Sequence, residues 1–359
     1  TMCFFVVTGF SFFPGVFENK AQLALVIDFS KSSEKTIEAL TLNYWELYTE
    51  FRAENPFIEI EIALIGYSRK AFNGKNNYVK IISDFKDRPE VAFEYLVHNE
   101  IGSSVAENNV GYALDMTLQG LSWSNNESVK KQIFTIGNGA INSSFSLAKK
   151  VCEKAKKRNI KVNFLYLLHK DIDKNFGYWK TLKKMSGGKL RTLVSKYLVG
   201  NGLPGAEDNI ARIIKENAVL NSTYVYYGAG KENYDFMNEI DSKSIALGDR
   251  VISNRVLYKS SPFFQGKNAD WDLVDFVNPK KNQQFNLKDL MVSDVYKNMS
   301  EIQLKKTILI LALKRKRSLQ IINKLYQGNL QINALRPKKP AFKKDLSETI
   351  LSIFSEGGF

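Results

Sequence analysis

The stretch LALVI at residues 23–27, followed by DFSKS at residues 28–32, decides the fold of this chain. Five consecutive apolar residues predict a strand that is buried on both faces, as at the centre of a parallel sheet. Helical spacing of apolar residues follows from Glu34 to Glu54, and Ser32 or Ser33 can cap that helix. We therefore predict a strand, a polar loop and a helix in direct succession.

The same alternation continues along the chain. Strand patterns occupy residues 58–67, 78–83, 132–136, 161–168 and 189–194, and helical patterns occupy residues 89–97, 110–121, 144–158 and 172–185. This order predicts an α/β fold with a doubly wound, mainly parallel sheet and helices on both faces. In such folds, ligands bind at the carboxyl ends of the strands.

The pattern changes after about residue 218, where strand signals give way to polar and helical stretches, including residues 231–242 and 299–326. The sequence therefore predicts four segments. Residues 1–21 are a candidate signal peptide, 22–220 an α/β domain, 221–335 a helical, basic C-terminal extension, and 336–359 a linker or tail. Trp271 is predicted to anchor the extension on the α/β domain.

The net charge of +14 is concentrated near the C-terminus. Residues 280–345 hold 16 Lys and Arg against 4 Asp and Glu, including the run Lys314–Arg317. Such a segment favours an anionic partner: nucleic acid, an acidic glycan or a phospholipid surface. The alternative is a solvated helical face. No stacking-aromatic motif accompanies the charge, which disfavours nucleic acid.

The N-terminal stretch CFFVVTGFSFF, residues 3–13, suits the apolar core of a signal peptide, with cleavage after Ala21. It is too short to span a bilayer as a helix, and no other apolar run approaches the roughly 20 residues that this requires. This interpretation predicts an extracytoplasmic protein, whether periplasmic, secreted or surface-associated. The alternative is a buried N-terminal strand. The two cysteines, Cys3 and Cys152, do not suggest a disulfide framework.

Asp28, Ser30 and Ser32 alternate in a tight loop directly after the first strand. Alternate residues can point one carboxylate and two hydroxyls towards one spot. Hard divalent cations such as Mg²⁺ bind oxygen ligands of this kind, with water or a partner's carboxylate completing the shell. The alternative is a loop that only caps the following helix.

The segment LVIDFSKS at residues 25–32 resembles the opening of a von Willebrand factor A (VWA) domain with its metal-ion-dependent adhesion site. More of the chain, roughly residues 23–326, resembles a bacterial branch whose first loop reads D-T-T-G-S. The matching segments are ALIGY (63–67), YVKIISDF (78–85), ENNVGYAL (107–114), LSWS (121–124), QIFTIGN (132–138), NSTYVYYG (221–228) and DWDLVDFV (270–277). The resemblance implies a Rossmann-like VWA fold and a binding function.

Two departures from that branch concern the site. Its G-G-G-D-x-P-E loop corresponds here to GSSVAEN, residues 102–108, so that Val105 stands where an acidic residue is usual. Asn138 replaces the acidic residue after the fourth core strand. The resemblance implies that Mg²⁺ or Mn²⁺ would bind Asp28, Ser30, Ser32 and Asn138. Alternatively, the site is degenerate and the loops form a metal-free contact surface. The residues predicted for the partner-binding surface are Phe29, Lys31, Val105 and Gly139.

No catalytic motif accompanies these residues. The sequence lacks a G-x-S-x-G elbow, an H-E-x-x-H motif and a P-loop lysine, and no second acid or base pairs with Asp28. We therefore predict a non-enzymatic, adhesion-type module that recognises a protein or another macromolecule at the carboxyl ends of the strands. The alternative is a scaffold whose basic extension binds nucleic acid or an anionic envelope surface.

Overall fold

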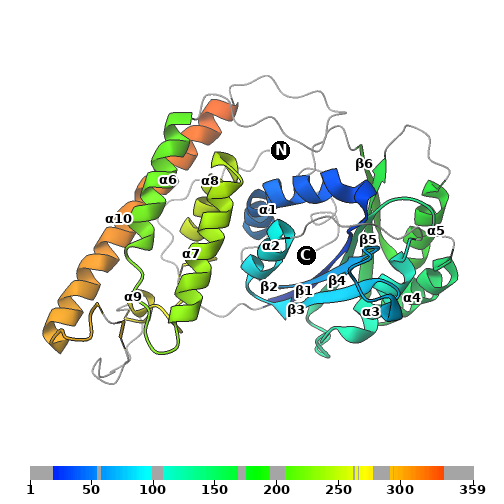
Figure 1. Ribbon diagram of the computed structural model, residues 1–359, viewed down its shortest axis with the longest axis horizontal. Helices are drawn as coiled ribbons and strands as arrows, with labels where there is room; N and C mark the ends of the chain where they lie inside the picture. Colours follow the sequence, from blue (N-terminus) through cyan, green and yellow to red (C-terminus); the bar gives the residue numbers. More distant parts are fainter. Residues whose placement is uncertain are drawn as a thin grey trace.

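A six-stranded sheet forms the centre of the N-terminal part of the chain (Figure 1). The structure is a computed structural model that describes residues 19–54, 58–98, 108–141, 143–168, 175–194, 207–261, 263–265, 267–277, 292–293 and 295–334. The strand order is β3-β2-β1-β4-β5-β6, and only β3 runs antiparallel to its neighbour. The strands are β1 (Asn19–Asp28), β2 (Ile58–Tyr67), β3 (Val79–Lys86), β4 (Lys130–Gly137), β5 (Ile160–Leu168) and β6 (Gly187–Val194). The predicted doubly wound, mainly parallel α/β fold is confirmed.

Strand β1 lies between β2 and β4, parallel to both. Its side chains alternate between the two faces: Leu23 and Ile27 belong to one apolar core, and Ala24 and Val26 to the other. This double burial explains why the segment is a continuous apolar run. The strand begins at Asn19, four residues before the predicted start. The apolar stretch at residues 3–13 lies outside the described residues.

Helices cover both faces of the sheet (Figure 1). One face carries α1 (Glu34–Glu54) and α2 (Pro89–His98), and the other carries α3 (Val110–Gly120), α4 (Phe145–Lys157) and α5 (Phe176–Ser186). A Cβ atom at Gly111 would lie 2.2 Å from the carbonyl oxygen of Ser144. Glycine at this position therefore allows α3 to pack closely against the start of α4.

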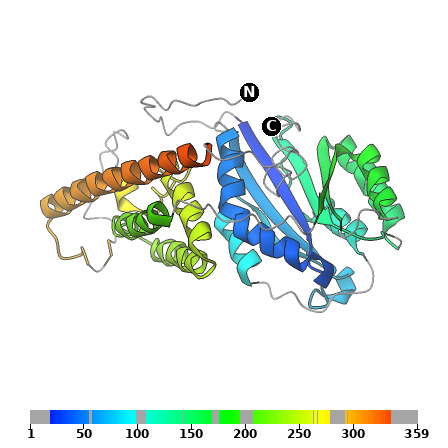
Figure 2. The same cartoon turned by 90° about the horizontal axis from the view of Figure 1, so that it is seen from above.

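The C-terminal extension is a separate group of helices beside the α/β domain (Figures 1 and 2). It contains α7 (Lys231–Ala246), α8 (Asp249–Ser260), α9 (Leu273–Phe276) and the long α10 (Glu301–Ala334). One further helix, α6 (Glu207–Asn221), was not expected from the sequence and packs against α8 and α10. The packing of the extension therefore begins before residue 221. None of the described helices combines the length and the apolar character needed to cross a membrane.

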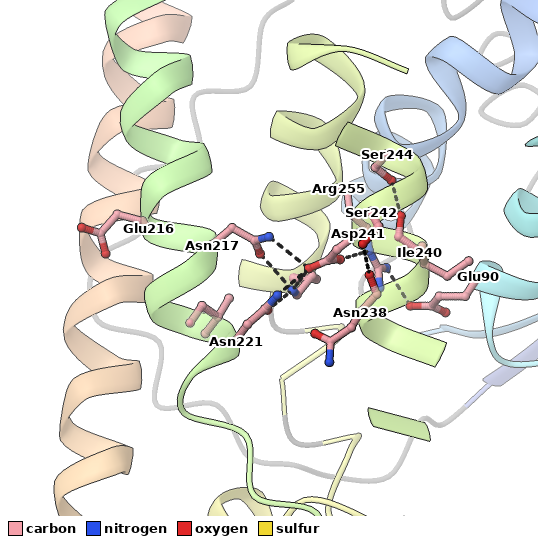
Figure 3. Close-up of polar contacts among 12 residues, drawn as sticks. Glu90, Glu216, Asn217, Asn221, Asn238, Ile240, Asp241, Ser242, Ser244 and Arg255 are labelled. Carbon is pink, nitrogen blue, oxygen red and sulfur yellow. Dashed lines mark hydrogen bonds and ion pairs between the residues drawn. The ribbon is translucent and has the colours of Figure 1, made fainter. Parts of the chain in front are cut away.

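A buried polar network joins the extension to the α/β domain (Figure 3). Arg255 on α8 donates to Glu90 of α2 at 2.7 Å and to Asp241 of α7 at 3.2 Å. Lys259, one turn further along α8, donates to Asp241 at 2.6 Å and to Asn217 of α6 at 2.9 Å. These bonds satisfy charges that are removed from water, and they connect four helices.

Aromatic rings surround this network at the junction of the two parts. Trp45 of α1 stacks on Tyr258 of α8, with ring centroids 5.2 Å apart, and the Arg255 guanidinium lies 4.4 Å from the Trp45 ring centroid. Trp271, the predicted anchor, packs on Tyr224 within the extension at 5.7 Å. The stacking contact between the α/β domain and the extension is therefore made by Trp45 and Tyr258.

Candidate functional site

The carboxyl ends of β1 and β4 meet at one edge of the sheet, because the two strands pair in parallel up to Ile27 and Ile136. Asp28 is the last residue of β1, and Asn138 directly follows β4. The hydroxyl oxygens of Ser30 and Ser32 lie 2.8 Å apart, and the Ser32 hydroxyl donates to Oδ1 of Asn138 at 3.3 Å. The structure therefore brings the two serines and Asn138, from different strand ends, next to Asp28.

Asp28 is almost completely removed from solvent, with 3% of its surface exposed. Its Oδ1 accepts a hydrogen bond from the backbone N–H of Ser30 at 2.8 Å. Burial raises the pKa of Asp28 to about 6, although hydrogen bonding from Ser30 acts in the opposite direction. No described cationic side chain contributes to this shift. At neutral pH the site thus holds a buried negative charge that lacks a balancing cation from the described residues.

A second group of polar residues, which sequence reasoning missed, supports the loop after β4. Asn108 donates through Nδ2 to the carbonyl of Asn138 and accepts through Oδ1 from the N–H of Val110 at 3.0 Å. The Ser144 hydroxyl donates to the Asn108 carbonyl at 3.1 Å and accepts from the N–H of Gly111 at the same distance. Asn108 was recognisable only as a polar residue just before a helix, a position that suits capping.

The prediction that Phe29 contributes to the partner-binding surface is wrong. Phe29 is fully buried and makes edge contacts with Phe72 at 6.0 Å and with Tyr95 at 5.8 Å. Its backbone N–H still donates to the Tyr67 carbonyl, at 2.9 Å, so the extended chain continues one residue beyond Asp28. Successive side chains of an extended chain point to opposite sides, which directs Phe29 into the core.

The other predicted surface residues differ in position. Lys31 is exposed at the start of the short helix η1 (Lys31–Ser33). Gly139 is half-buried and adopts φ +77°, a left-handed conformation that glycine tolerates without strain, and its carbonyl accepts from the Trp179 indole at 3.0 Å. Val105 lies outside the described residues.

The donor atoms of this site are all oxygens: one carboxylate, two hydroxyls and one carboxamide. Oxygen ligands suit hard divalent cations such as Mg²⁺ or Mn²⁺. In the part of the chain that the structure describes, no three His, Cys, Asp or Glu side chains are grouped so that they could hold a metal ion. The donor set therefore fits a hard cation, but Asp28 supplies its single negative charge. Water or an external carboxylate must complete the coordination shell.

Comparison with protein-family models gave no match, and comparison with curated proteins gave no significant match. Similar solved structures include the SpRpn10 VWA domain, with 12% identity over 49% of this chain and 88% of that chain and a TM-score of 0.36. The conserved hypothetical protein BatB from Bacteroides thetaiotaomicron is 12% identical over 48% of this chain and 90% of its own, with a TM-score of 0.35. Proximal thread matrix protein 1 from the mussel byssus is 15% identical over 50% of this chain and 43% of its own, with a TM-score of 0.34. Identities this low concern the fold and transfer neither a ligand nor an activity.

Proposed function

We propose that this chain is a non-enzymatic, VWA-type binding module that recognises a protein or another macromolecule through the loops at the carboxyl ends of β1 and β4. The observation that carries the proposal is the buried Asp28 carboxylate, whose charge no described cationic side chain balances. An ionised group in such a position costs stability, and strongly perturbed groups of this kind concentrate at functional sites.

In this proposal Asp28, Ser30, Ser32 and Asn138 hold Mg²⁺ or Mn²⁺, and the ion accepts a carboxylate of the partner. The hydroxyls of Ser30 and Ser32 are hydrogen-bonded to each other, so the cation would replace that contact. One protein carboxylate leaves a divalent ion with a net positive charge. The exposed Lys31 beside the loop adds another. Both charges favour an acidic partner.

The polar groups described around Asp28 support binding rather than catalysis. They are hydroxyls and carboxamides, which do not exchange protons readily near neutral pH. An extracytoplasmic location remains part of the proposal and depends on the apolar stretch at residues 3–13.

Thermal unfolding tests the metal site. The wild type, Asp28→Ala and Asp270→Ala are compared at pH 7.5 in EDTA and in millimolar Mg²⁺ or Mn²⁺. Asp270 is an exposed carboxylate in the extension and serves as the control. A ligand at a hundredfold excess over its Kd stabilises the native state by about 2.7 kcal/mol. We expect the midpoint to rise by a few degrees in the wild type and in Asp270→Ala, and to stay constant in Asp28→Ala. An unchanged midpoint in all three proteins contradicts the metal-bridged mechanism.

The second candidate function is a scaffold that binds an anionic envelope surface or nucleic acid through the basic extension. Binding that weakens steeply with salt and ignores EDTA favours this function over the metal-bridged one. Helix α10 supports binding to an anionic surface, because it exposes basic and apolar side chains on one face.

A further inference from the structure

Helix α10 lies at the outer edge of the molecule, on the side of the extension that is farthest from the sheet (Figures 1 and 2). One of its faces packs against α6, α8 and α9. That face carries Leu304, Ile308, Arg315, Ser318 and Ile322, all of which are buried. The opposite face is directed to solvent.

The outward face carries an apolar stripe. Ile302 is 81% exposed, Leu309 60% and Leu313 61%, and the neighbouring Ile310 is 56% exposed. Residues 302, 309 and 313 are seven and four positions apart, so 3.6 residues per turn place them on one line along the helix. Single exposed aliphatic residues are common, but three of them on one line of a helix, with Ile310 beside them, indicate an interaction surface.

Basic side chains flank this stripe on both sides. Helical spacing places Lys305 and Lys316 on one side and Lys306 and Arg317 on the other, and all four are exposed. The 34-residue helix contains seven Lys and Arg against a single acidic residue, Glu301. Apolar and cationic groups therefore share the same outward face.

Arg315 fixes the rotation of α10 about its axis. Unlike its neighbours in the basic run, it is 4% exposed and donates to Asp272 and Asp275 of the α9 segment, both at 2.6 Å. It also donates to the Thr223 carbonyl at 2.8 Å, and its guanidinium lies 4.3 Å from the Tyr224 ring centroid. The interpretation of Lys314–Arg317 as a solvated face is therefore correct for Lys314, Lys316 and Arg317, which are exposed, and wrong for Arg315. Because this buried ion pair resists rotation, the stripe cannot turn inward.

We propose that this face of α10 docks on the surface of an anionic phospholipid bilayer, with Ile302, Leu309 and Leu313 entering the headgroup region. A helix with an apolar stripe and cationic flanks binds in the plane of such an interface. Its Lys and Arg side chains then contact the anionic headgroups. Nucleic acid fits less well, because aliphatic side chains neither stack on bases nor contact phosphates. The surface is remote from the ends of β1 and β4, so the proposal stands independently of the metal site (Figure 1).

Vesicle co-sedimentation of the full chain tests this proposal. The vesicles contain either phosphatidylcholine alone or phosphatidylcholine mixed with phosphatidylglycerol. The apolar variant carries Leu309→Gln and Leu313→Gln and removes apolar contacts. The charge variant carries Lys306→Gln, Lys316→Gln and Arg317→Gln and removes three positive charges. The matched controls are Ile245→Gln, at an apolar residue of α7 that is 54% exposed, and Lys154→Gln with Lys156→Gln and Lys157→Gln, at three exposed lysines of α4.

We expect the wild type to bind the mixed vesicles and not those of phosphatidylcholine alone. A basic residue near an anionic surface contributes about 1 kcal/mol, so the charge variant should bind on the order of a hundredfold more weakly. The apolar variant should bind at least about tenfold more weakly, because each leucine loses a buried apolar contact. Both control variants should bind within about twofold of the wild type. All substitutions are at exposed positions, and far-ultraviolet circular dichroism checks that the fold is retained.

Four outcomes would overturn the proposal. In the first, the wild type binds neither kind of vesicle or binds both equally. In the second, the α4 charge control weakens binding as much as the α10 charge variant does. In the third, the wild type is a dimer in sedimentation and the apolar variant a monomer, which assigns the stripe to self-association. In the fourth, the charge variant loses affinity for duplex DNA while the apolar variant binds vesicles normally.

Discussion

At the scale of single residues, the raised pKa of Asp28 predicts how the stability of the protein depends on pH. Its pKa is about 6 in the folded protein against a reference of 3.8, so the folded state binds the proton more tightly than the unfolded state. Stability should therefore increase as the pH falls from above 6 towards 4, and the penalty for the charge is fully present above pH 6. A shift of about two units corresponds to about 3 kcal/mol.

Asp28→Asn should remove this penalty and keep the oxygen that accepts from Ser30. We expect the variant to be more stable than the wild type by about 2 to 3 kcal/mol at pH 7.5, with the advantage disappearing near pH 4. Urea unfolding at several pH values in EDTA measures it, with the exposed Asp270→Asn as control. A difference that does not vary with pH would show that the charge of Asp28 is not its cause.

The candidate site was partly predictable from the sequence. Asp28 and Asn138 each follow an apolar run, and parallel strands bring their carboxyl ends to one edge of the sheet. Phe29 was misassigned because its position between two polar ligand candidates was given more weight than its apolar side chain. The alternation of side chains already favoured an inward position. The contact of Asn108 with Asn138 depends on how two separate loops meet, and no local pattern encodes it.

At the scale of elements, the packing of α8 against α6 and α7 depends on Asp241, which bonds to side chains of both α6 and α8. Burial alone would raise the pKa of this carboxyl, but the charges of Lys259 and Arg255 outweigh it and hold the pKa at about 2. Because the folded-state pKa is depressed, the stabilisation is present above pH 4 and is lost as the pH falls towards 2. Lys259 and Arg255 are both fully buried, so neither cation can be hydrated if Asp241 loses its charge.

Asp241→Asn should destabilise the protein by about 3 to 5 kcal/mol at pH 7, because it removes the carboxylate that pairs with both Lys259 and Arg255 and leaves the Glu90 pair to Arg255. Denaturant unfolding measures the change. Asp235→Asn is the matched control, since Asp235 lies on the same helix and pairs with Lys231 at the surface. It should leave the midpoint nearly unchanged. Equal effects of the two substitutions would contradict a structural role for the buried network.

The start of β1 gives a further prediction. Removing residues 1–18 leaves the strand whole, whereas removing residues 1–21 also deletes Asn19, Lys20 and the fully buried Ala21. The deleted segment pairs with the start of β2, and Lys20 forms an ion pair with Glu61 at 2.6 Å. The shorter chain should lose a few kcal/mol of stability, at about 1 kcal/mol per hydrogen bond. Identical urea midpoints of the two chains would contradict this.

The elements themselves were largely predictable, because apolar runs and helical spacing are local signals. Helix α6 was missed, although Ile210, Ile213 and Leu220 follow helical spacing and are buried. The change in composition near residue 218 was taken as the end of a domain. It is the end of a helix whose apolar side packs on α8 and α10, which come later in the chain.

At the scale of the whole molecule, the α/β domain and the extension should unfold together. The Trp45–Tyr258 stack and the buried Glu90–Arg255 pair belong to both parts at once. Unfolding of the wild type followed by tryptophan fluorescence and by far-ultraviolet circular dichroism should give coincident transitions. An earlier loss of helical signal would show that the extension detaches first.

The central place of β1 also has a consequence for synthesis at the ribosome. The strand is made first among the described elements, yet one of its two neighbours, β4, is complete only at Gly137. Roughly 110 residues separate the ends of these strands, which at about 5 to 20 residues per second corresponds to roughly 5 to 20 seconds. During that interval the LALVI segment has an unpaired edge. A nascent chain of this protein should therefore be a client of ribosome-associated chaperones until its fourth strand emerges.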